Sequence, residues 1–194
     1  MKASLTIPNV LTLARIALTI AAVGMAVRGA APLAVAILIA AALLDAFDGW
    51  YARAFSQSTS LGKHLDPFAD KVLVAVILLW LGMDARSVAA WCLIGVALAR
   101  EAAMTGLRMH SVRAQGRLIP ASSLGRWKMF LQSTGGLTIL SFTHILHRSV
   151  PEGWVIAALA IMLGVSLAAM LGYIKAKGPA ADHEQTHFAL RSPG

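Results

Sequence analysis

Four aspartates are concentrated in one short stretch of this chain, LLDAFDGWYARAFSQSTSLGKHLDPFADK at 43–71. Asp45 and Asp48 stand three residues apart, Asp66 and Asp70 stand four apart, and together they are four of only nine acidic residues in the protein. Carboxylates at these spacings share one face of a helix. Short acidic ligands without a Cys or His cluster suit Mg²⁺ or Mn²⁺, and two such ions suit a reaction at phosphorus.

Small and basic residues share the two aspartate faces. Gly49, Ala52 and Arg53 continue the face of the first pair, and Gly62 precedes the second pair by one turn. A glycine lets a bulky group approach the helix backbone. Four carboxylates at a membrane edge must stay protonated, pair with basic residues or bind cations. Simple helix capping is a weak explanation for four carboxylates on matched faces.

The composition predicts that these faces belong to membrane helices. The chain has 194 residues, of which 58% are hydrophobic and 13% charged, whereas soluble domains average about 45–50% and 25%. The single cysteine, Cys92, lies in an apolar run and is expected to be a small buried hydrophobe. We predict an all-α bundle of six transmembrane helices, each about 20 residues or longer, at 8–27, 32–55, 61–82, 87–109, 124–146 and 153–175.

The distribution of basic residues predicts an orientation. Only Arg28, Arg86 and Arg148 of the 17 Lys and Arg residues fall in the turns on one side. The positive-inside rule then places both termini, and the aspartate stretch, in the cytoplasm. The net charge is +8, and the basic residues lie between hydrophobic runs and not along one polar face. This pattern favours anionic membrane lipid over nucleic acid as the partner of the basic residues.

The two ends of the chain differ in composition, since the first is apolar and the last is polar. A cleaved signal peptide is the rival to a retained first span, but Arg15 interrupts the apolar run and the run is long for a signal. We predict one transmembrane domain at 1–176 and a disordered cytoplasmic tail at 177–194. His183 and His187 stand four apart in this tail, and without a third ligand a solvated tail is the favoured interpretation.

The aspartate stretch resembles the signature of the CDP-alcohol phosphotransferases, D-x-x-D-G-x-x-A-R followed by G-x-x-x-D-x-x-x-D. Here it reads Asp45-Ala-Phe-Asp48-Gly49-Trp-Tyr-Ala52-Arg53, then eight residues, then Gly62-Lys-His-Leu-Asp66-Pro-Phe-Ala-Asp70. Two later segments, AREAAMTGLRMHSVRAQGRLIPAS and LGRWKMFLQ, are similar to the phosphatidylglycerophosphate synthases of this family. Arg126 and Met129 depart from their pattern. The resemblance covers roughly residues 5 to 135.

The resemblance implies a role for each signature residue. Asp45, Asp48 and Asp66 are expected to bind Mg²⁺ or Mn²⁺, with two ions in the site. Asp70 is expected to touch a metal and to act as the general base. The resemblance also implies a homodimer in a bacterial inner membrane, with its active site facing the cytoplasm. Its CDP-diacylglycerol site would include Pro8, Asn9, Gly49, Ala52, Arg53, Thr59 and Gly62.

The implied reaction joins CDP-diacylglycerol to sn-glycerol 3-phosphate with release of CMP. A single in-line displacement is favoured, because no cysteine or Ser–His pair stands near the aspartates. The acceptor phosphate requires cations on the cytoplasmic side, where the arginine fork suits phosphate oxygens. Glu101 is expected to orient Arg100. The candidate cations for the acceptor phosphate are Arg15, Arg100, Arg108, Arg117, Arg126 and Lys128.

Alternatives stay open at this stage. Inositol phosphate, serine or phosphatidylglycerol can replace the acceptor within the same family. A cation-coupled carrier also uses intramembrane carboxylates, but these cluster at one edge and the chain shows no repeated halves. Gly164, Ala168 and Gly172 form a stripe of small residues that favours close helix contact, within the bundle or between protomers.

Overall fold

The computed structural model describes residues 7–55, 62–115 and 123–176, and within these ranges it contains helices and no strand. The predicted all-α class is therefore confirmed for this part of the chain. Runs of apolar residues form helices here because a helix satisfies every backbone polar group internally. The elements are α1 (Ile7–Val27), α2 (Ala31–Phe55), α3 (Gly62–Ala85), α4 (Val88–Gln115), α5 (Ser123–Leu140), the π-helix η1 (Ser141–Ile145) and α6 (Glu152–Ala176).

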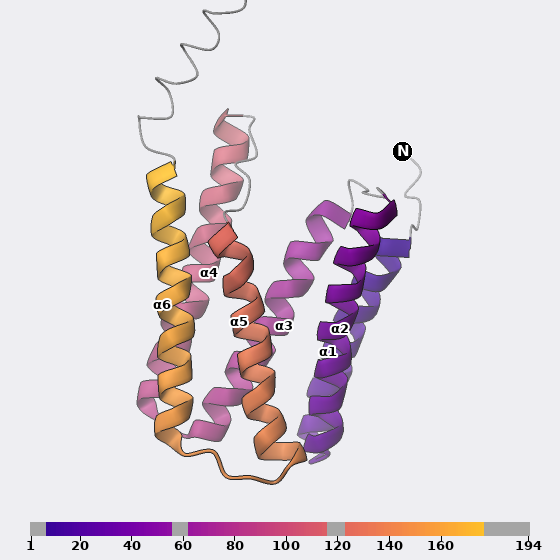
Figure 1. Ribbon diagram of the computed structural model, residues 1–194, viewed down its shortest axis with the longest axis vertical. Helices are drawn as coiled ribbons and strands as arrows, with labels where there is room; N and C mark the ends of the chain where they lie inside the picture. Colours follow the sequence, from indigo (N-terminus) through magenta and orange to yellow (C-terminus); the bar gives the residue numbers. More distant parts are fainter. Residues whose placement is uncertain (1–6, 56–61, 116–122, 177–194) are drawn as a thin grey trace, which may run out of the picture.

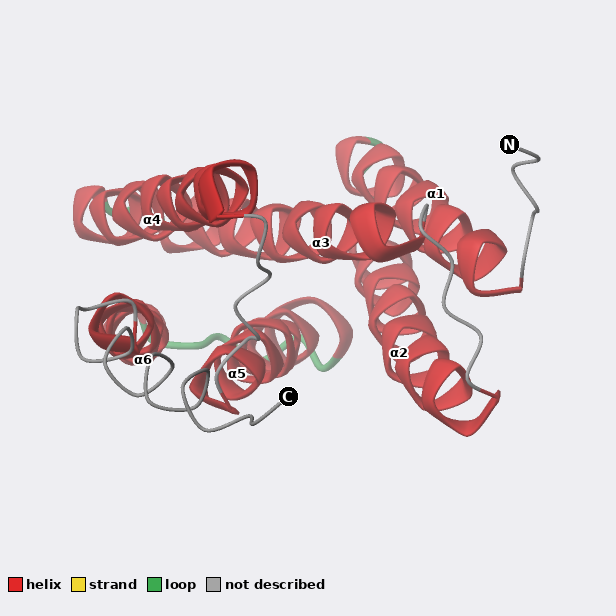
Figure 2. Ribbon diagram, turned by 90° about the horizontal axis from the view of Figure 1, so that it is seen from above, coloured by secondary structure: helices red, strands yellow, loops and turns green. Residues whose placement is uncertain are grey.

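The helices alternate in direction along one bundle (Figure 1). Seen from above, α3 lies between the pair α1 and α2 on one side and the group α4, α5 and α6 on the other (Figure 2). α1 packs against both α2 and α3, whereas α2 and α3 touch each other little. We call the end of the bundle where α2 ends and α3 begins the aspartate end, and the opposite end the far end.

Apolar side chains from different helices interlock in the interior. Leu38 of α2, Ile77 and Leu81 of α3 and Leu140 of α5 are all fully buried. Large apolar side chains also cover the outside, including Ile161 of α6. An apolar exterior around an apolar core is the arrangement expected where the helices face lipid.

Two adjacent glycines let α5 approach its neighbours closely. A Cβ atom added at Gly136 would lie 2.3 Å from Cγ2 of Ile77, and one added at Gly135 would lie 2.7 Å from Cε of Met162. No side chain fits at Gly136 without displacing α3, because Ile77 is branched at Cβ and stiff. These glycines therefore set the spacing of α5 between α3 and α6.

The observed helices follow the predicted spans, with two differences in their limits. α4 continues to Gln115, beyond the predicted end at 109, and α5 ends at Leu140, before the predicted end at 146, where η1 follows it. Cys92 was expected to be buried and is exposed. Among the described residues, three helices are long and apolar enough to cross a membrane, while α2 offers a shorter apolar segment, Ala31–Phe47.

The far end is closed by a π-helical turn that follows α5. The backbone N–H of Leu146 donates to the carbonyl of Ser141 at 3.0 Å, five residues back. This turn places the His144 ring nitrogen 2.8 Å from the Asp84 carboxylate and its ring 5.1 Å from that of Trp80. The turn therefore joins the end of α5 to the end of α3.

Candidate active site

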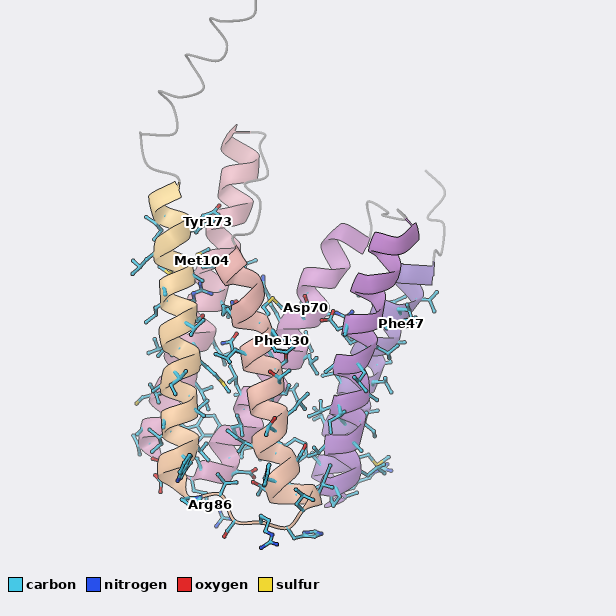
Figure 3. The ribbon with its side chains drawn as sticks, in the orientation of Figure 1. Phe47, Asp70, Arg86, Met104, Phe130 and Tyr173 are labelled. Atoms are coloured by element: carbon cyan, nitrogen blue, oxygen red, sulfur yellow. The ribbon has the colours of Figure 1, made fainter. Side chains whose placement is uncertain are left out.

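Asp45 of α2 and Asp70 of α3 are brought together by Arg15 of α1. Nη1 of Arg15 lies 2.7 Å from Oδ1 of Asp45 and 2.6 Å from Oδ1 of Asp70. Figure 3 shows Asp70 on the part of α3 that lies toward the aspartate end. Asp45 and Asp70 therefore meet through a third helix, while α2 and α3 themselves pack on each other little.

Burial explains why Arg15 needs these two partners. Its side chain is 1% exposed, whereas the side chains of Asp45 and Asp70 are 50% and 21% exposed. A buried guanidinium without a carboxylate partner would be very costly, so the two acids hold Arg15 inside the bundle. In return, two carboxylates from separate helices converge on one positive centre. That convergence fits a site for cations.

The other predicted residues are placed only in part. The backbone carries Asp48, Gly49, Ala52 and Arg53 in the last turns of α2 and Gly62 and Asp66 in the first turns of α3. Pro8 and Asn9 lie in the first turn of α1, Arg108 in α4 and Arg126 in α5, while Thr59, Arg117 and the tail fall outside the described residues. Among the side chains that the structure describes, which do not include those of Asp48 and Asp66, no group of three or more potential metal ligands occurs.

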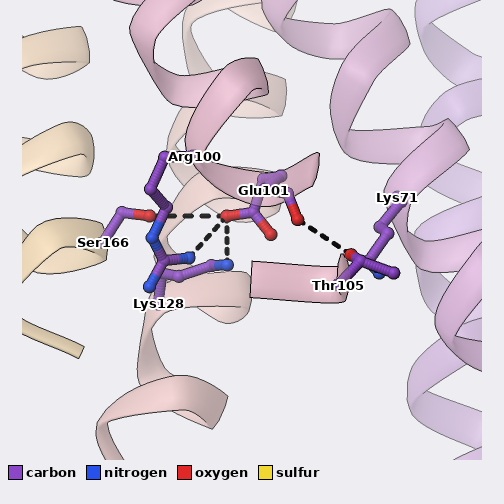
Figure 4. Close-up of polar contacts among 6 residues, drawn as sticks. All are labelled: Lys71, Arg100, Glu101, Thr105, Lys128 and Ser166. Atoms are coloured by element: carbon purple, nitrogen blue, oxygen red, sulfur yellow. Dashed lines mark hydrogen bonds and ion pairs between the residues drawn. The ribbon is translucent and has the colours of Figure 1, made fainter. Parts of the chain in front are cut away.

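A second polar cluster joins α4, α5 and α6. Nη1 of Arg100 donates to Oε1 of Glu101 at 2.8 Å, and Lys128 of α5 donates to the same oxygen. The hydroxyl of Ser166 on α6 reaches that oxygen at 3.4 Å (Figure 4). The expected contact between Glu101 and Arg100 is confirmed. The roles of Lys128 and Ser166 as further partners of Glu101 were not predicted.

A chain of contacts connects this second cluster to α3. The hydroxyl of Thr105 donates to the backbone carbonyl of Glu101 at 2.8 Å, and Lys71 donates to that hydroxyl oxygen (Figure 4). Lys71 directly follows Asp70 in the sequence. The two polar clusters therefore flank the same turn of α3.

Gln132 of α5 is a buried polar residue that sequence analysis did not select. It stands four residues after Lys128, on the same face of the helix, and both its amide atoms are buried without a hydrogen-bond partner among the described residues. Nε of Arg100 is also buried without a hydrogen-bond partner among the described residues. The only sequence signal was the spacing from Lys128, which places Gln132 one turn deeper in the bundle.

Comparisons with known proteins found one matching family model and several relatives. A family model described as CDP-alcohol phosphatidyltransferase matches residues 5–172. The CDP-diacylglycerol–glycerol-3-phosphate 3-phosphatidyltransferase of Rickettsia bellii is 34% identical over 177 residues, covering 86% of this chain and 95% of that protein. A chloroplastic/mitochondrial enzyme of the same name from Arabidopsis thaliana is 35% identical, covering 84% of this chain.

Another relative carries a different name. The cardiolipin synthase (CMP-forming) of Oryza sativa is 31% identical over 188 residues, covering 88% of this chain. The matched part of this chain spans only 58% of the Arabidopsis protein and 57% of the rice protein. These longer relatives therefore contain sequence that has no counterpart in the alignment.

Proposed function

We propose a function for this chain, which belongs to the CDP-alcohol phosphatidyltransferase family. The resemblance stated from the aspartate signature is thereby confirmed. The proposed reaction transfers the phosphatidyl group of CDP-diacylglycerol to sn-glycerol 3-phosphate and releases CMP. Several relatives are named for this reaction, and the match to the Rickettsia protein spans nearly its whole length. The structural observation that carries the proposal is the convergence of Asp45 and Asp70 on one positive centre.

The donor side of the site rests on the aspartates. The family generally uses divalent metal ions, and Asp45 and Asp70 supply the oxygen ligands that Mg²⁺ or Mn²⁺ prefers. The spacing on α2 and α3 adds Asp48 and Asp66 to the same two helix faces. We propose that two ions bind at this site. They would neutralise the negative charge of the pyrophosphate and of the departing CMP.

Asp70 is the proposed general base. It accepts the proton of the glycerol hydroxyl while the hydroxyl oxygen forms a bond to the phosphorus that carries the lipid. The bond from that phosphorus to the CMP oxygen breaks in the same displacement. Arg15 holds Asp70 in place from the neighbouring helix through its 2.6 Å contact.

The acceptor phosphate is proposed to bind at Arg100 and Lys128. Together with Glu101 these side chains carry one net positive charge, and all three are largely buried. An anion is attracted more strongly to such a site than to a cation in water, because the surroundings screen the charges less. Lys71 and Thr105 connect this site to the turn of α3 that carries Asp70.

The membrane arrangement is part of the proposal. We propose that all six helices span a bacterial inner membrane and that the aspartate end faces the cytoplasm. The far-end turns hold Arg28, Arg86 and Arg148, which are the three basic residues expected on the opposite side. A homodimer is also proposed, because added Cβ atoms at Gly164 and Gly172 meet nothing within 4 Å, which leaves this stripe open to a second copy.

A second acceptor is favoured by one observation. The rice relative is named as a CMP-forming cardiolipin synthase, so phosphatidylglycerol is the alternative acceptor to test. A carrier is disfavoured, because the family model names a transferase and matches most of the chain.

The deciding experiment measures CMP release from purified protein. CDP-diacylglycerol is supplied with Mg²⁺ or Mn²⁺ and, in separate reactions, with glycerol 3-phosphate, phosphatidylglycerol, inositol phosphate or serine. We expect CMP release with glycerol 3-phosphate and loss of activity with a chelator. CMP release with phosphatidylglycerol and with no other acceptor would make phosphatidylglycerol the acceptor in place of glycerol 3-phosphate. Transport of a cation without CMP release would overturn the enzymatic proposal.

A further inference from the structure

Arg15 is an unusual component of a site expected to bind cations. It is a cation already, it is almost completely buried, and one of its nitrogens contacts a carboxylate from each of two helices. Its backbone carbonyl also accepts a hydrogen bond from the Thr19 hydroxyl at 2.9 Å, one turn along α1. Arg15 is therefore fixed inside the bundle against the two carboxylates. This position differs from that of an exposed surface cation that is available to bind a phosphate.

We propose that Arg15 is the resident counter-cation of Asp45 and Asp70. It compensates the two carboxylates when no divalent ion is bound, and its contribution becomes smaller when an ion is bound. This inference rests on the proposed metal site, and it goes beyond that site by assigning a coupling between Arg15 and the ion. Arg15 is a positioning residue in this proposal, and it is not a ligand of the acceptor phosphate.

Charge explains the direction of the coupling. The two carboxylates carry two negative charges, and Arg15 offsets one of them at contacts of 2.7 and 2.6 Å. A divalent ion at the same carboxylates offsets both charges. The ion also repels the guanidinium at short range in a weakly screening interior. Arg15 and the ion therefore compete for the same negative charge. Removal of Arg15 should lower the unfolding temperature of the ion-free protein and raise its affinity for the ion.

A merely structural role predicts the opposite sign for ion binding. If Arg15 only held α2 and α3 in place, its loss would separate the carboxylates and weaken the site for any cation. Competition and structural support therefore predict opposite changes in one measurable quantity, the affinity for the ion. Both roles predict a less stable ion-free protein.

The test compares Arg15→Met with Arg28→Met in the full-length protein. Arg28 is exposed in the turn after α1, so its replacement removes the same charge away from the aspartates. Thermal unfolding in chelator measures the ion-free protein. Binding of Mn²⁺ alone, without nucleotide or acceptor, is measured from the electron paramagnetic resonance signal of the free ion. We expect Arg15→Met to unfold several degrees below Arg28→Met in chelator, and to bind Mn²⁺ about fivefold or more tightly.

A further variant keeps the test decisive if Arg15→Met does not fold in chelator. Adding Asp45→Asn removes one of the two uncompensated charges, so the double variant should recover the lost stability. A double variant that stays unfolded would overturn the proposal. So would an unfolding temperature of Arg15→Met equal to that of Arg28→Met, or weaker Mn²⁺ binding by Arg15→Met.

The failure of the inference is distinct from the failure of the proposed function. If wild type and both single variants bind neither Mn²⁺ nor Mg²⁺, the proposed metal site is wrong and the competition falls with it. If wild type binds Mn²⁺ and Arg15→Met binds it equally well, the metal site stands and only the role of Arg15 is overturned.

Discussion

Glu101 and Lys128 are paired across α4 and α5 although 27 residues separate them in the chain. The same carboxylate oxygen accepts a hydrogen bond from Arg100, and the three side chains are only 17%, 7% and 6% exposed. Glu101, within the apolar stretch Val88–Leu107 of α4, therefore compensates two buried cations, Arg100 beside it and Lys128 on α5.

This pairing predicts that Glu101→Ala destabilises the protein by about 3–5 kcal/mol, because it removes the carboxylate that compensates two buried cations. The free energy of unfolding in detergent measures the effect. Glu152→Ala is the matched control, since Glu152 is exposed at the start of α6. Adding Lys128→Met to Glu101→Met should recover part of the loss, because Arg100 stays buried without the Glu101 carboxylate. Equal stability of Glu101→Ala and Glu152→Ala would contradict the prediction.

Lys128→Met is expected to raise the KM for glycerol 3-phosphate about tenfold or more, a loss typical of one charged hydrogen bond to an anion. The KM for CDP-diacylglycerol should change little, because Lys128 of α5 contacts Glu101 of α4 and lies apart from the aspartates. Steady-state CMP release at varied concentrations of each substrate separates the two constants. Arg86→Met, in the far-end turn, is the charge-matched control. A larger change in the constant for the donor would assign Lys128 to the nucleotide instead.

Asp70→Asn should lower kcat by about 10²–10⁴-fold, which is the usual contribution of a general base. The protein should remain folded, because asparagine keeps the shape and can still accept a hydrogen bond from Arg15. Turnover is measured by CMP release and folding by gel filtration in detergent. Asp84→Asn at the far end serves as the control and should keep its activity, since Asp84 contacts His144 and no predicted site residue. Normal turnover by the Asp70 variant would remove its assigned role.

Gly136→Ala should destabilise the bundle by about 1–3 kcal/mol through overpacking against Ile77. Gly95→Ala provides the comparison within the same fold, because an added Cβ there meets nothing within 4 Å. Thermal unfolding of the two variants measures the difference. If both behave alike, the close approach of α5 to α3 is not as the structure has it.

The proposed orientation predicts opposite labelling of the two ends of the molecule. In a Cys92→Ser background, a cysteine introduced by Arg86→Cys should react with a membrane-impermeant maleimide added outside intact cells. A cysteine introduced by Ser192→Cys should react only after the cells are opened. Labelling of both from outside would disprove cytoplasmic placement of the C-terminus.

Much of the helical architecture could be predicted, because apolar length and turn residues are local signals. The predicted and observed helix limits agree closely for α1 and α2. α4 and α5 are the exceptions: α4 continues to Gln115 through a polar segment, and α5 gives way to the π-helix η1 after Leu140. Hydropathy marks where a helix leaves the apolar region and not where its backbone hydrogen bonds end.

The site could be predicted in its residue types but not in its pairings. Spacing placed Asp45 and Asp70 on helix faces, and charge selected Arg15 as a cation of interest. Neither signal shows that α1 lies against both α2 and α3, which is what makes Arg15 their partner. Likewise, nothing in the sequence around Lys128 indicates that it reaches Glu101, because a contact between distant helices leaves no local periodicity.

The π-helical turn Ser141–Ile145 has a consequence for how this chain can change in length. A π-turn accommodates one more residue than an α-turn, so deleting a single residue here would let the backbone close into a regular helix without breaking the chain path. The deletion would change the position of His144, because His144 lies inside the wide turn that is lost. His144 would then lose its contacts with Asp84 and Trp80. Variants that lack one residue of this turn should therefore remain helical yet lose the contacts that His144 makes with α3.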